Sequence, residues 1–453
     1  MFFYNKMNKI QLFALLNYTK KGLYMVKVVR GIKEAKEEIL NIRKRQLESL
    51  NEQTFFTTVT KIINNVKDLG DQALINYTKD FDNVTLENIL IPQKVLKDSW
   101  DNIDQKLKNS LMLASKRITE YHKISKPKEW YDKKNQYGVK NIPVEKAGVY
   151  IPGGNAPLLS TVLMTVIPAK VAGVSEVFVC TPPSFHGLPH PFILAACYLA
   201  KVDKVYTIGG AQSIAAMAYG TQTVEKVDII CGPGNKWVTE AKRQLFGKVG
   251  IDGLYGPTES FIIGDDTAIP EFCAVDFVSQ AEHDISSVPL FCTNSEKLLY
   301  KVKKLIPDYL NINNKDIAEN VIKNNGLLIL VDDIKDSILL VNTFAPEHVS
   351  VMTKINNEIL DGLKHVGVIF LGSYSHHVLG DYIAGPSHAM PTGGTASFSS
   401  GLGVDTFIKF VPYVNIDKHE ALELSYSASI IGKAELMEGH SNSALERINK
   451  QKD

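Results

Sequence analysis

Four pairs of polar residues in the second half of the chain could carry out chemistry. The pairs are Gln280 with His283, Glu347 with His348, Asp381 with His388, and Glu435 with His440. Residues three positions apart share one face of a helix, so Gln280 and His283 can converge on one point. The adjacent carboxylate and imidazole of Glu347 and His348 can supply two acid–base groups side by side. The sequence therefore predicts an acid–base centre with nitrogen and oxygen donors near it.

The cysteines narrow the choice of metal site and of compartment. The chain has five cysteines, an odd number, and none forms a C-x-x-C pair. This pattern excludes a disulfide framework and a zinc ribbon, and it is typical of a reducing compartment. Nitrogen and oxygen donors suit Zn²⁺, Mn²⁺ or Co²⁺ and are typical of an open metal site.

The adjacent histidines His376 and His377 are a further possible ligand pair. Adjacent residues on an extended strand point apart, so we expect both to face solvent.

Glycine- and proline-rich turns follow the apolar runs between residues 147 and 245. The runs are residues 147–151, 176–180, 204–208 and 227–231, and three of the turns are Pro152-Gly153-Gly154, Gly209-Gly210 and Gly232-Pro233-Gly234. Open parallel sheets bind ligands beyond the carboxyl ends of their strands, where glycine lets the backbone approach a phosphate. None of the turns matches G-x-G-x-x-G. We therefore expect a nucleotide or dinucleotide site that differs from the ordinary Rossmann site.

These residues must be positioned by two sets of alternating strands and helices. The second set of apolar runs covers residues 260–263, 289–292, 326–331 and 367–371. Apolar strands that alternate with helical patterns indicate parallel sheets covered by helices on both faces. The pattern of residues 31–130 is mostly helical, and so is the end of the tail after about residue 404. We expect an α/β fold with two sheets of about four strands each and small helical extensions at both ends.

Composition excludes several other classes of protein. Fifty Lys and Arg residues balance 49 Asp and Glu residues, so a nucleic-acid-binding surface is not expected. There is no apolar run long enough to span a membrane. No G-x-S-x-G elbow occurs, so an α/β-hydrolase would lack its nucleophile. We interpret residues 1–24 as an extension before a functional chain that begins at Met25, rather than as a targeting signal.

Several longer motifs, taken together, resemble the histidinol dehydrogenase family. They are residues 148–154 (GVYIPGG), 209–214 (GGAQSI), 232–235 (GPGN), 279–283 (SQAEH), 345–348 (APEH), 380–382 (GDY) and 439–440 (GH). They follow the order and spacing of the family and cover the chain from about Met25 to its C-terminus. The resemblance implies that L-histidinol is oxidised through an aldehyde to L-histidine, the last step of histidine biosynthesis. It also implies two NAD⁺-dependent steps, one zinc ion per subunit and a cytoplasmic homodimer.

The resemblance also implies roles for individual residues. The expected NAD contacts are Tyr150, Gln212 and Asn235, and the expected zinc ligands are Gln280, His283, Asp381 and His440. The acid–base pair is Glu347 and His348. The expected substrate contacts are Thr258, Gln280, His283, His348, Asp381, Glu435 and His440. His388 matches a further active-site histidine.

The architecture implied by the family is an intertwined homodimer of two incomplete Rossmann-like domains. We expect an N-terminal extension and helical arm over residues 1–44. The zinc and substrate side is expected in residues 45–149 plus 258–402, and the NAD side in residues 150–257. Residues 403–453 are expected to form a helical dimerisation segment. In this arrangement Glu435 and His440 complete the active site of the partner subunit.

Departures from the family pattern leave alternatives open. Thr258 stands where Ser is usual, Ser387 stands where Asn is usual, and residues 375–378 lack the usual Pro-Glu. A related zinc- and NAD-dependent dehydrogenase for another small alcohol, such as a sulfonated polyol, is one alternative, although Glu435 favours histidinol. A second is a zinc hydrolase in which Glu347 activates water without NAD⁺. A third is a non-catalytic protein that uses only the nucleotide site.

Overall fold

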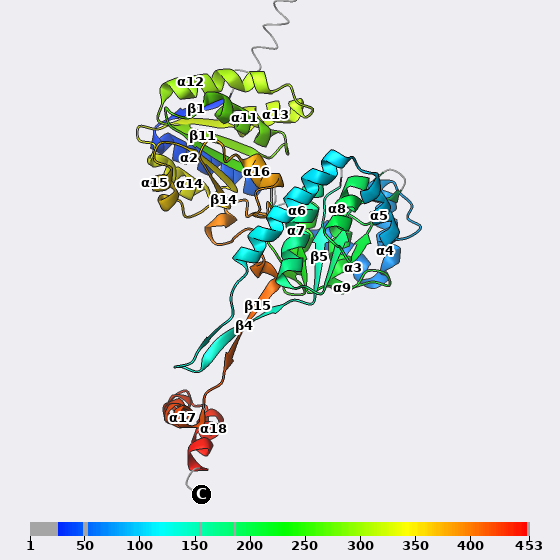
Figure 1. Ribbon diagram of the computed structural model, residues 1–453, viewed down its shortest axis with the longest axis vertical. Coiled ribbons are helices and arrows are strands. Elements are labelled where there is room, and N and C mark those ends of the chain that lie inside the picture. The colour runs from blue at the N-terminus through cyan, green and yellow to red at the C-terminus, as the bar shows by residue number, and fades with distance from the viewer. Residues whose placement is uncertain (1–25, 49–52, 154–155, 185–186, 451–453) are drawn as a thin grey trace, which may run out of the picture. The chain divides into compact units, whose positions relative to one another are not determined.

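The computed structural model describes residues 26–48, 53–153, 156–184 and 187–450, so the extension expected over residues 1–24 lies outside the described residues. The chain divides into two units (Figure 1). We call residues 1–125 and 145–407 the main unit, and residues 126–144 and 408–453 the tail unit. None of the described helices is long and apolar enough to cross a bilayer.

The first sheet of the main unit has six parallel strands in the described residues. Their order is β1 (Lys27–Arg30), β12 (Leu327–Leu330), β11 (Val288–Thr293), β10 (Glu259–Gly264), β13 (His348–Met352) and β14 (Val368–Leu371). The central strands β10, β11 and β13 are buried at every position, because helices cover both faces of the sheet. This burial explains why their sequences are continuous apolar runs rather than alternating ones.

Successive side chains of these strands enter two separate cores, one on each face of the first sheet. Ile262, Phe291 and Leu328 pack under α11 (Pro270–Ala281), α12 (Glu296–Leu305) and α13 (Lys315–Asn324). Their neighbours on the opposite face pack under α2 (Ile32–Glu48), α14 (Asp336–Phe344) and α15 (Asn356–Gly362). Figure 1 shows these helices on the two sides of the sheet. The short helix α16 (His377–Tyr382) follows the edge strand β14.

The second sheet also has six strands in the described residues. Their order is β2 (Leu90–Ile91), β7 (Lys204–Tyr206), β6 (Glu176–Cys180), β5 (Lys146–Tyr150), β8 (Ile229–Cys231) and β9 (Gly250–Ile251). All pairs are parallel except that of β2 with β7. The two-residue strands β2 and β9 lie at the edges and were not expected, because such short segments carry no periodicity of their own.

Two groups of helices surround the second sheet. One group shares a core with Tyr150 and Phe178, and consists of α3 (Gln53–Leu69), α4 (Asp71–Asp82), α9 (Gly210–Tyr219) and α10 (Lys236–Leu245). The other group consists of α5 (Gln93–Asn102), α6 (Gln105–Ser125), α7 (Leu159–Ala172) and α8 (Pro191–Leu199). Helix α7 contacts β5 and β6 and packs against α6 and α8. Its middle is buried all round, which explains its almost purely apolar sequence.

This packing differs from the expected division of the chain. Residues 27–44, expected in an N-terminal extension and arm, supply strand β1 and most of helix α2 to the first sheet. Residues 53–125, expected with the first sheet, pack instead on the second sheet. Neighbouring positions in the sequence do not reveal which sheet an amphipathic helix covers, because both sheets offer an apolar face. The pattern over residues 55–76 is also two helices, which meet at Gly70 with a φ of 59°.

The tail unit contains a small antiparallel sheet and a helical hairpin. Strand β4 (Tyr137–Pro143) pairs with β3 (Trp130–Asp132) on one side and with β15 (Ile408–Val414) on the other. Helices α17 (Lys418–Ala434) and α18 (Glu438–Asn449) then pack against each other. Only helices were expected after residue 403. Strand β15 was missed because its partner lies far away in the sequence.

Candidate active site

The expected nucleotide contacts lie on turns at the carboxyl ends of the second sheet. Tyr150 ends strand β5, and its buried hydroxyl accepts a hydrogen bond from the backbone N–H of Gly210 at 3.3 Å. Gln212 lies in the first turn of α9 and is 1% exposed, yet neither its amide nitrogen nor its amide oxygen has a partner among the described residues. A buried amide without a partner is costly, so Gln212 is a group that a bound ligand would satisfy.

The third turn is fixed by its own backbone conformation. Gly232 has a φ of 107°, and a Cβ atom there would collide with the carbonyl oxygen of Tyr150. Asn235 caps helix α10, because its side-chain oxygen accepts hydrogen bonds from the N–H groups of Trp237 and Val238. Gly154, in the first of the three turns, lies outside the described residues.

A buried ion pair of Lys242 with Asp252 binds both the backbone N–H and the backbone carbonyl oxygen of Gly232. Asp252 accepts the Gly232 N–H at 2.7 Å, and the Lys242 ammonium donates to the Gly232 carbonyl oxygen at 3.1 Å. The two side chains also bind each other and are 2% and 0% exposed. The adjacent thiol of Cys231 is buried, and burial raises its pKa well above the usual range. Cys231 is therefore an inert structural thiol.

The predicted acid–base pair lies at the amino end of the first sheet. His348 is the first residue of β13, Glu347 directly precedes it, and Thr258 directly precedes β10. The Thr258 hydroxyl oxygen lies 2.7 Å from Glu347 Oε2 and 3.0 Å from Gln280 Oε1. His348 Nε2 lies 3.6 Å from Asp381 Oδ1. The structure thus brings together five residues that the sequence singled out.

The imidazole of His348 lies between two carboxylates. Its Nδ1 is 3.5 Å from Glu347 Oε2, and both distances are too long for good hydrogen bonds. Neither ring nitrogen has a hydrogen-bond partner among the described residues, although the side chain is only 4% exposed. The nitrogens are therefore free to exchange protons with a bound substrate or water.

Burial and charge shift the acidities of this cluster in opposite directions. Burial raises the pKa of Glu347 to about 7. Burial lowers the pKa of His348, but the carboxylates of Glu347 and Asp381 outweigh it and raise that pKa to about 9. Burial also raises the pKa of Asp381, but its interactions with His348 outweigh this effect and bring it down to about 2. The cluster therefore keeps Asp381 anionic and titrates Glu347 near neutral pH.

His388 binds the backbone of Asp381. Its Nδ1 lies 2.7 Å from the carbonyl oxygen of Asp381, and its Nε2 lies 3.0 Å from the hydroxyl oxygen of Thr161 on α7. A carbonyl only accepts, so Nδ1 carries the proton, and the Thr161 hydroxyl donates to Nε2. Both ring nitrogens of His388 are occupied, so this histidine orients the Asp381 segment and has no nitrogen left for a ligand.

The predicted metal ligands are distributed over both units. Gln280 is buried at the end of α11, and its amide nitrogen has no partner among the described residues. His283 is exposed and lies just beyond that helix, which ends at Ala281. Glu435 and His440 lie in the tail unit, at the end of α17 and in α18. Across the residues described, no group of three or more His, Cys, Asp or Glu side chains is placed to hold a metal.

The expected exposure of the pair His376 and His377 is wrong for His377. This residue begins α16 and is 2% exposed, and its Nε2 lies 3.0 Å from the hydroxyl oxygen of Ser279. The segment is helical rather than extended, which turns His377 inward beside His348, with 6.4 Å between the ring centroids. The one sequence feature that could have indicated an inward-facing His377 is that residues 375–378 lack the usual Pro-Glu of the family.

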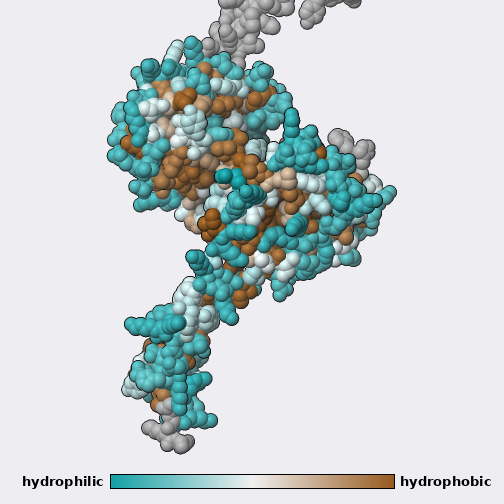
Figure 2. Space-filling view, viewed as in Figure 1, coloured by the Kyte–Doolittle hydropathy of each residue, from teal (hydrophilic) through white to brown (hydrophobic). Residues whose placement is uncertain are grey.

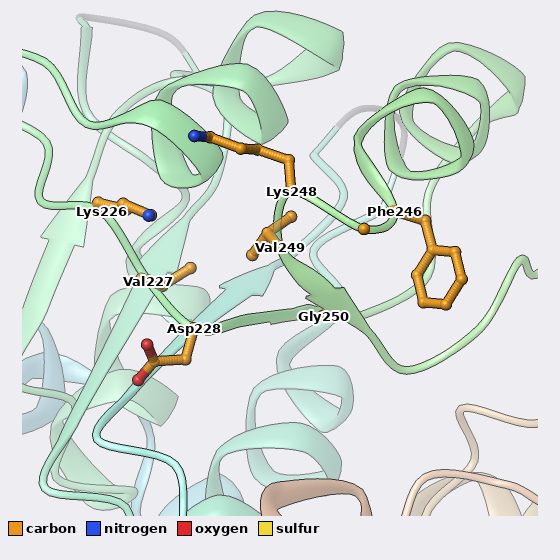
Figure 3. Close-up of a pocket in the computed structure, with 8 residues that line it drawn as sticks. Lys226, Val227, Asp228, Phe246, Lys248, Val249 and Gly250 are labelled. Atoms are coloured by element: carbon orange, nitrogen blue, oxygen red, sulfur yellow. The ribbon is translucent and has the colours of Figure 1, made fainter. Parts of the chain in front are cut away.

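A surface pocket in the second sheet lies away from these groups. Figure 3 shows it lined by residues 226–228, which precede strand β8, and by residues 246–250, which lead into and begin strand β9. These residues are at the amino ends of parallel strands, whereas the glycine turns follow the carboxyl ends. The pocket contains none of the predicted site residues and is not part of the candidate active site.

Comparisons with known proteins agree with these motifs. The family model described as histidinol dehydrogenase matches residues 44–448. Histidinol dehydrogenase of Dehalococcoides mccartyi is 42% identical over 393 residues, covering 86% of this chain and 90% of that protein. The enzyme of Methanocaldococcus jannaschii is 38% identical over 432 residues, covering 94% and 99%.

A solved structure extends the agreement to the fold. The crystal structure of histidinol dehydrogenase from Elizabethkingia anophelis matches with a TM-score of 0.88 and 31% identity, covering 95% of this chain and 99% of that one. The family-model match covers the second sheet, every strand of the first sheet except β1, and both predicted clusters of site residues. The chain belongs to the histidinol dehydrogenase family.

Proposed function

We propose that the chain oxidises L-histidinol to L-histidine with NAD⁺, in two steps through the aldehyde L-histidinal. The observation that carries the proposal is the convergence of Glu347, His348, Asp381, Gln280 and Thr258 at one end of the first sheet. A buried base and a second carboxylate suit an alcohol oxidation followed by attack of water on an aldehyde. Membership of the family supports the same reaction.

In the first step His348 would accept the hydroxyl proton of the substrate, and NAD⁺, when bound, would accept the hydride. His348 can do so because its ring nitrogens have no other hydrogen-bond partner among the described residues. Asp381 is one of the two carboxylates that raise the pKa of His348. Compensating the charge of Asp381 with a bound cation would lower that pKa and favour the free-base form of His348.

In the second step Glu347 takes a proton from the water that attacks the aldehyde, and the resulting hydrate loses the second hydride. The Thr258 hydroxyl and the Glu259 N–H both bind Glu347 Oε2, so the carboxylate is held in one orientation. Burial raises the pKa of Glu347 to about 7, which matches a general base that works near neutral pH.

The donor set fits one Zn²⁺ ion. Gln280, His283 and Asp381 offer an amide, an imidazole and a carboxylate, and His440 from a second copy of the chain would complete the set. The carboxylate of Asp381 is anionic, and the side-chain oxygen of Gln280, which contacts the Thr258 hydroxyl at 3.0 Å, has a second lone pair for a metal ion. When bound, the ion would act as a template that orients the substrate and as a Lewis acid.

Metal removal is expected to abolish activity reversibly. Chelation should eliminate NADH formation from L-histidinol, and added Zn²⁺ should restore it, because the ion binds reversibly to its amide, imidazole and carboxylate donors. Asp381→Asn should bind markedly less zinc than the parent protein, since it loses the one carboxylate among the expected ligands. Zinc content is measured by elemental analysis after dialysis. Equal zinc in Asp381→Asn and the parent would contradict the assignment.

The glycine turns, together with Tyr150, Gln212 and Asn235, form the proposed NAD site. Helix α10 begins directly after the turn Gly232-Pro233-Gly234-Asn235, and a helix N-terminus offers N–H donors to a phosphate. The unpartnered amide of Gln212 and the close approach of Gly232 to Tyr150 both suit a ligand that contacts backbone. A zinc hydrolase that works without NAD⁺ would have no use for these features.

Gly232→Ala should raise the KM for NAD⁺ at least about tenfold, the equivalent of about 1.4 kcal/mol. The added Cβ would push the turn away from Tyr150. The matched control is Gly247→Ala, because Gly247 has a similar φ of 94° but nothing within 4 Å of a Cβ. Steady-state kinetics with varied NAD⁺ would measure both variants. An equal rise in KM for both would show that backbone strain, and not the turn, is responsible.

A homodimer is part of the proposal. Strand β15 and helix α17 carry exposed apolar side chains, among them Phe410, Val414, Tyr426, Ile430 and Ile431. The space-filling view shows apolar atoms among the polar ones on the tail unit (Figure 2). A second copy of the chain would cover such a surface. In that dimer, Glu435 and His440 of each chain would complete the active site of the other chain. We also propose that the enzyme works in the cytoplasm, because its five cysteines are all free and buried.

A substrate panel tests the proposed function. NADH formation would be followed with L-histidinol and, in parallel, with small polyols that include a sulfonated one. We expect L-histidinol to give the highest kcat/KM and L-histidine to be the product. A higher kcat/KM for a polyol would replace the proposal with the related-alcohol alternative. Release of a hydrolysis product without NAD⁺ would replace it with the zinc hydrolase.

A further inference from the structure

Arg43 on helix α2 is buried against the first sheet. Its guanidinium forms a two-pronged ion pair with Glu259, in which Nη1 binds Oε1 and Nη2 lies 3.1 Å from Oε2. The side chains are 12% and 1% exposed. Nη2 also donates to the carbonyl oxygen of Phe344 at 2.5 Å, and the guanidinium lies over the Phe344 ring, 4.0 Å from its centroid. The planar fork of Arg can bind a carboxylate, a carbonyl and a ring at once.

Both partners of Arg43 lead directly to the acid–base pair. Glu259 follows Thr258, and its backbone N–H donates to Glu347 Oε2 at 3.2 Å. Phe344 ends α14 and lies three residues before Glu347. The Glu259 carboxylate also accepts the N–H of Gly393 at 3.0 Å, which ties a third segment to the same point. One guanidinium therefore connects the two backbone segments that carry Thr258 and Glu347.

We propose that Arg43 is a positioning residue of the acid–base centre, which fixes Thr258 and Glu347 through Glu259 and the carbonyl of Phe344. Without the guanidinium, the buried Glu259 carboxylate would have no positive partner in this network and would turn toward water. The Glu259 peptide would then move, and Glu347 would lose its second hydrogen bond. A shift of about 1 Å at a reacting group can cost about a hundredfold in rate.

The test compares Arg43→Gln with a matched control on the same helix. Arg45→Gln is the control, because Arg45 is exposed and its hydrogen bond within the described part of the chain is a long one of 3.4 Å to the carbonyl oxygen of Asn324. We expect Arg43→Gln to lower kcat about tenfold to a hundredfold, while the affinity for NAD⁺, whose site is on the second sheet, stays within twofold. Arg45→Gln should leave both unchanged. Steady-state kinetics, NADH fluorescence titration and thermal unfolding would be measured on each full-length protein.

Chemical rescue separates positioning from simple loss of stability. Arg43→Ala leaves room for a free guanidinium ion beside Glu259. Added guanidinium, at concentrations far below those that unfold the protein, should therefore restore part of kcat. The same ion should not affect Arg45→Ala. If Arg43→Gln or Arg43→Ala fails to fold, Arg43→Met with Glu259→Met replaces the pair by apolar groups, which buried pairs often tolerate. That double variant should fold and keep the low kcat.

Three results would overturn the proposal: an unchanged kcat in folded Arg43→Gln, a parallel loss of NAD⁺ affinity, or full kcat in the double variant. The inference rests on the proposed function, but the two can fail separately. If the parent protein forms no NADH from L-histidinol, the proposed function fails. The Arg43 comparison is then made with the best substrate of the alcohol panel, where the same ratio of rates is expected.

Discussion

Glu347→Gln is expected to lower kcat for L-histidinol oxidation by about 10²–10⁴-fold, the usual contribution of a general base. Glutamine can still accept hydrogen bonds from Thr258 and from the Glu259 N–H, so the fold and the site geometry should persist. Glutamine cannot take a proton from water, however. Because His348 remains, the first hydride should still transfer, and the reaction should stall at the aldehyde.

Rapid-mixing kinetics would reveal this stall. Glu347→Gln should show a burst of about one NADH per active site followed by a very slow phase. The parent rate should also fall as the pH drops below about 7, because the carboxyl of Glu347 then becomes protonated and cannot act as a base. The decline near pH 7 that comes from Glu347 should be absent from the variant. A normal second phase in Glu347→Gln would show that another group activates the water.

His348→Gln is expected to remove the first step as well, with a loss of about 10²–10⁴-fold in kcat and no burst. His348 is the proposed acceptor of the hydroxyl proton, and its two nitrogens are free of other hydrogen bonds among the described residues. The side chain is almost fully buried, so solvent cannot easily replace it as a base.

Supplying L-histidinal separates the roles of the two residues. His348→Gln should oxidise this aldehyde with a smaller loss of rate than it shows with L-histidinol. Glu347→Gln should lose as much rate with the aldehyde as with the alcohol. Single-turnover NADH formation with each substrate would measure the four rates. A normal first burst in His348→Gln would contradict its assignment as the first base.

The sequence predicts most of the central strands and misses most of the edge strands. The run over residues 176–180 coincides with β6, and the helix over residues 105–125 coincides with α6, because both have a strong apolar pattern. The edge strands β1, β2 and β9 are too short to show a period. Strand β13 was missed because its first residue, His348, was interpreted only as a site residue.

The candidate site likewise contains residues that a local pattern predicts and residues that it does not. The adjacency of Glu347 and His348 was visible in the sequence, and the structure adds Asp381, Gln280 and Thr258 around them. Nothing in the neighbouring sequence distinguishes Arg43, Lys242 and Asp252 from solvated charges on helices and loops. Their burial depends on partners far away in the chain, as with Arg43 and Glu259, and no local pattern reveals such a partner.

The central claim is a four-electron oxidation of one substrate at one site. It is tested most directly by complete oxidation of a limiting amount of L-histidinol in excess NAD⁺, with NADH and L-histidine both quantified. An alcohol that becomes a carboxylate loses four electrons and each NAD⁺ accepts two, so the account predicts two NADH and one L-histidine per L-histidinol. One NADH with accumulated L-histidinal, or no NADH from a folded, zinc-loaded protein, would contradict it.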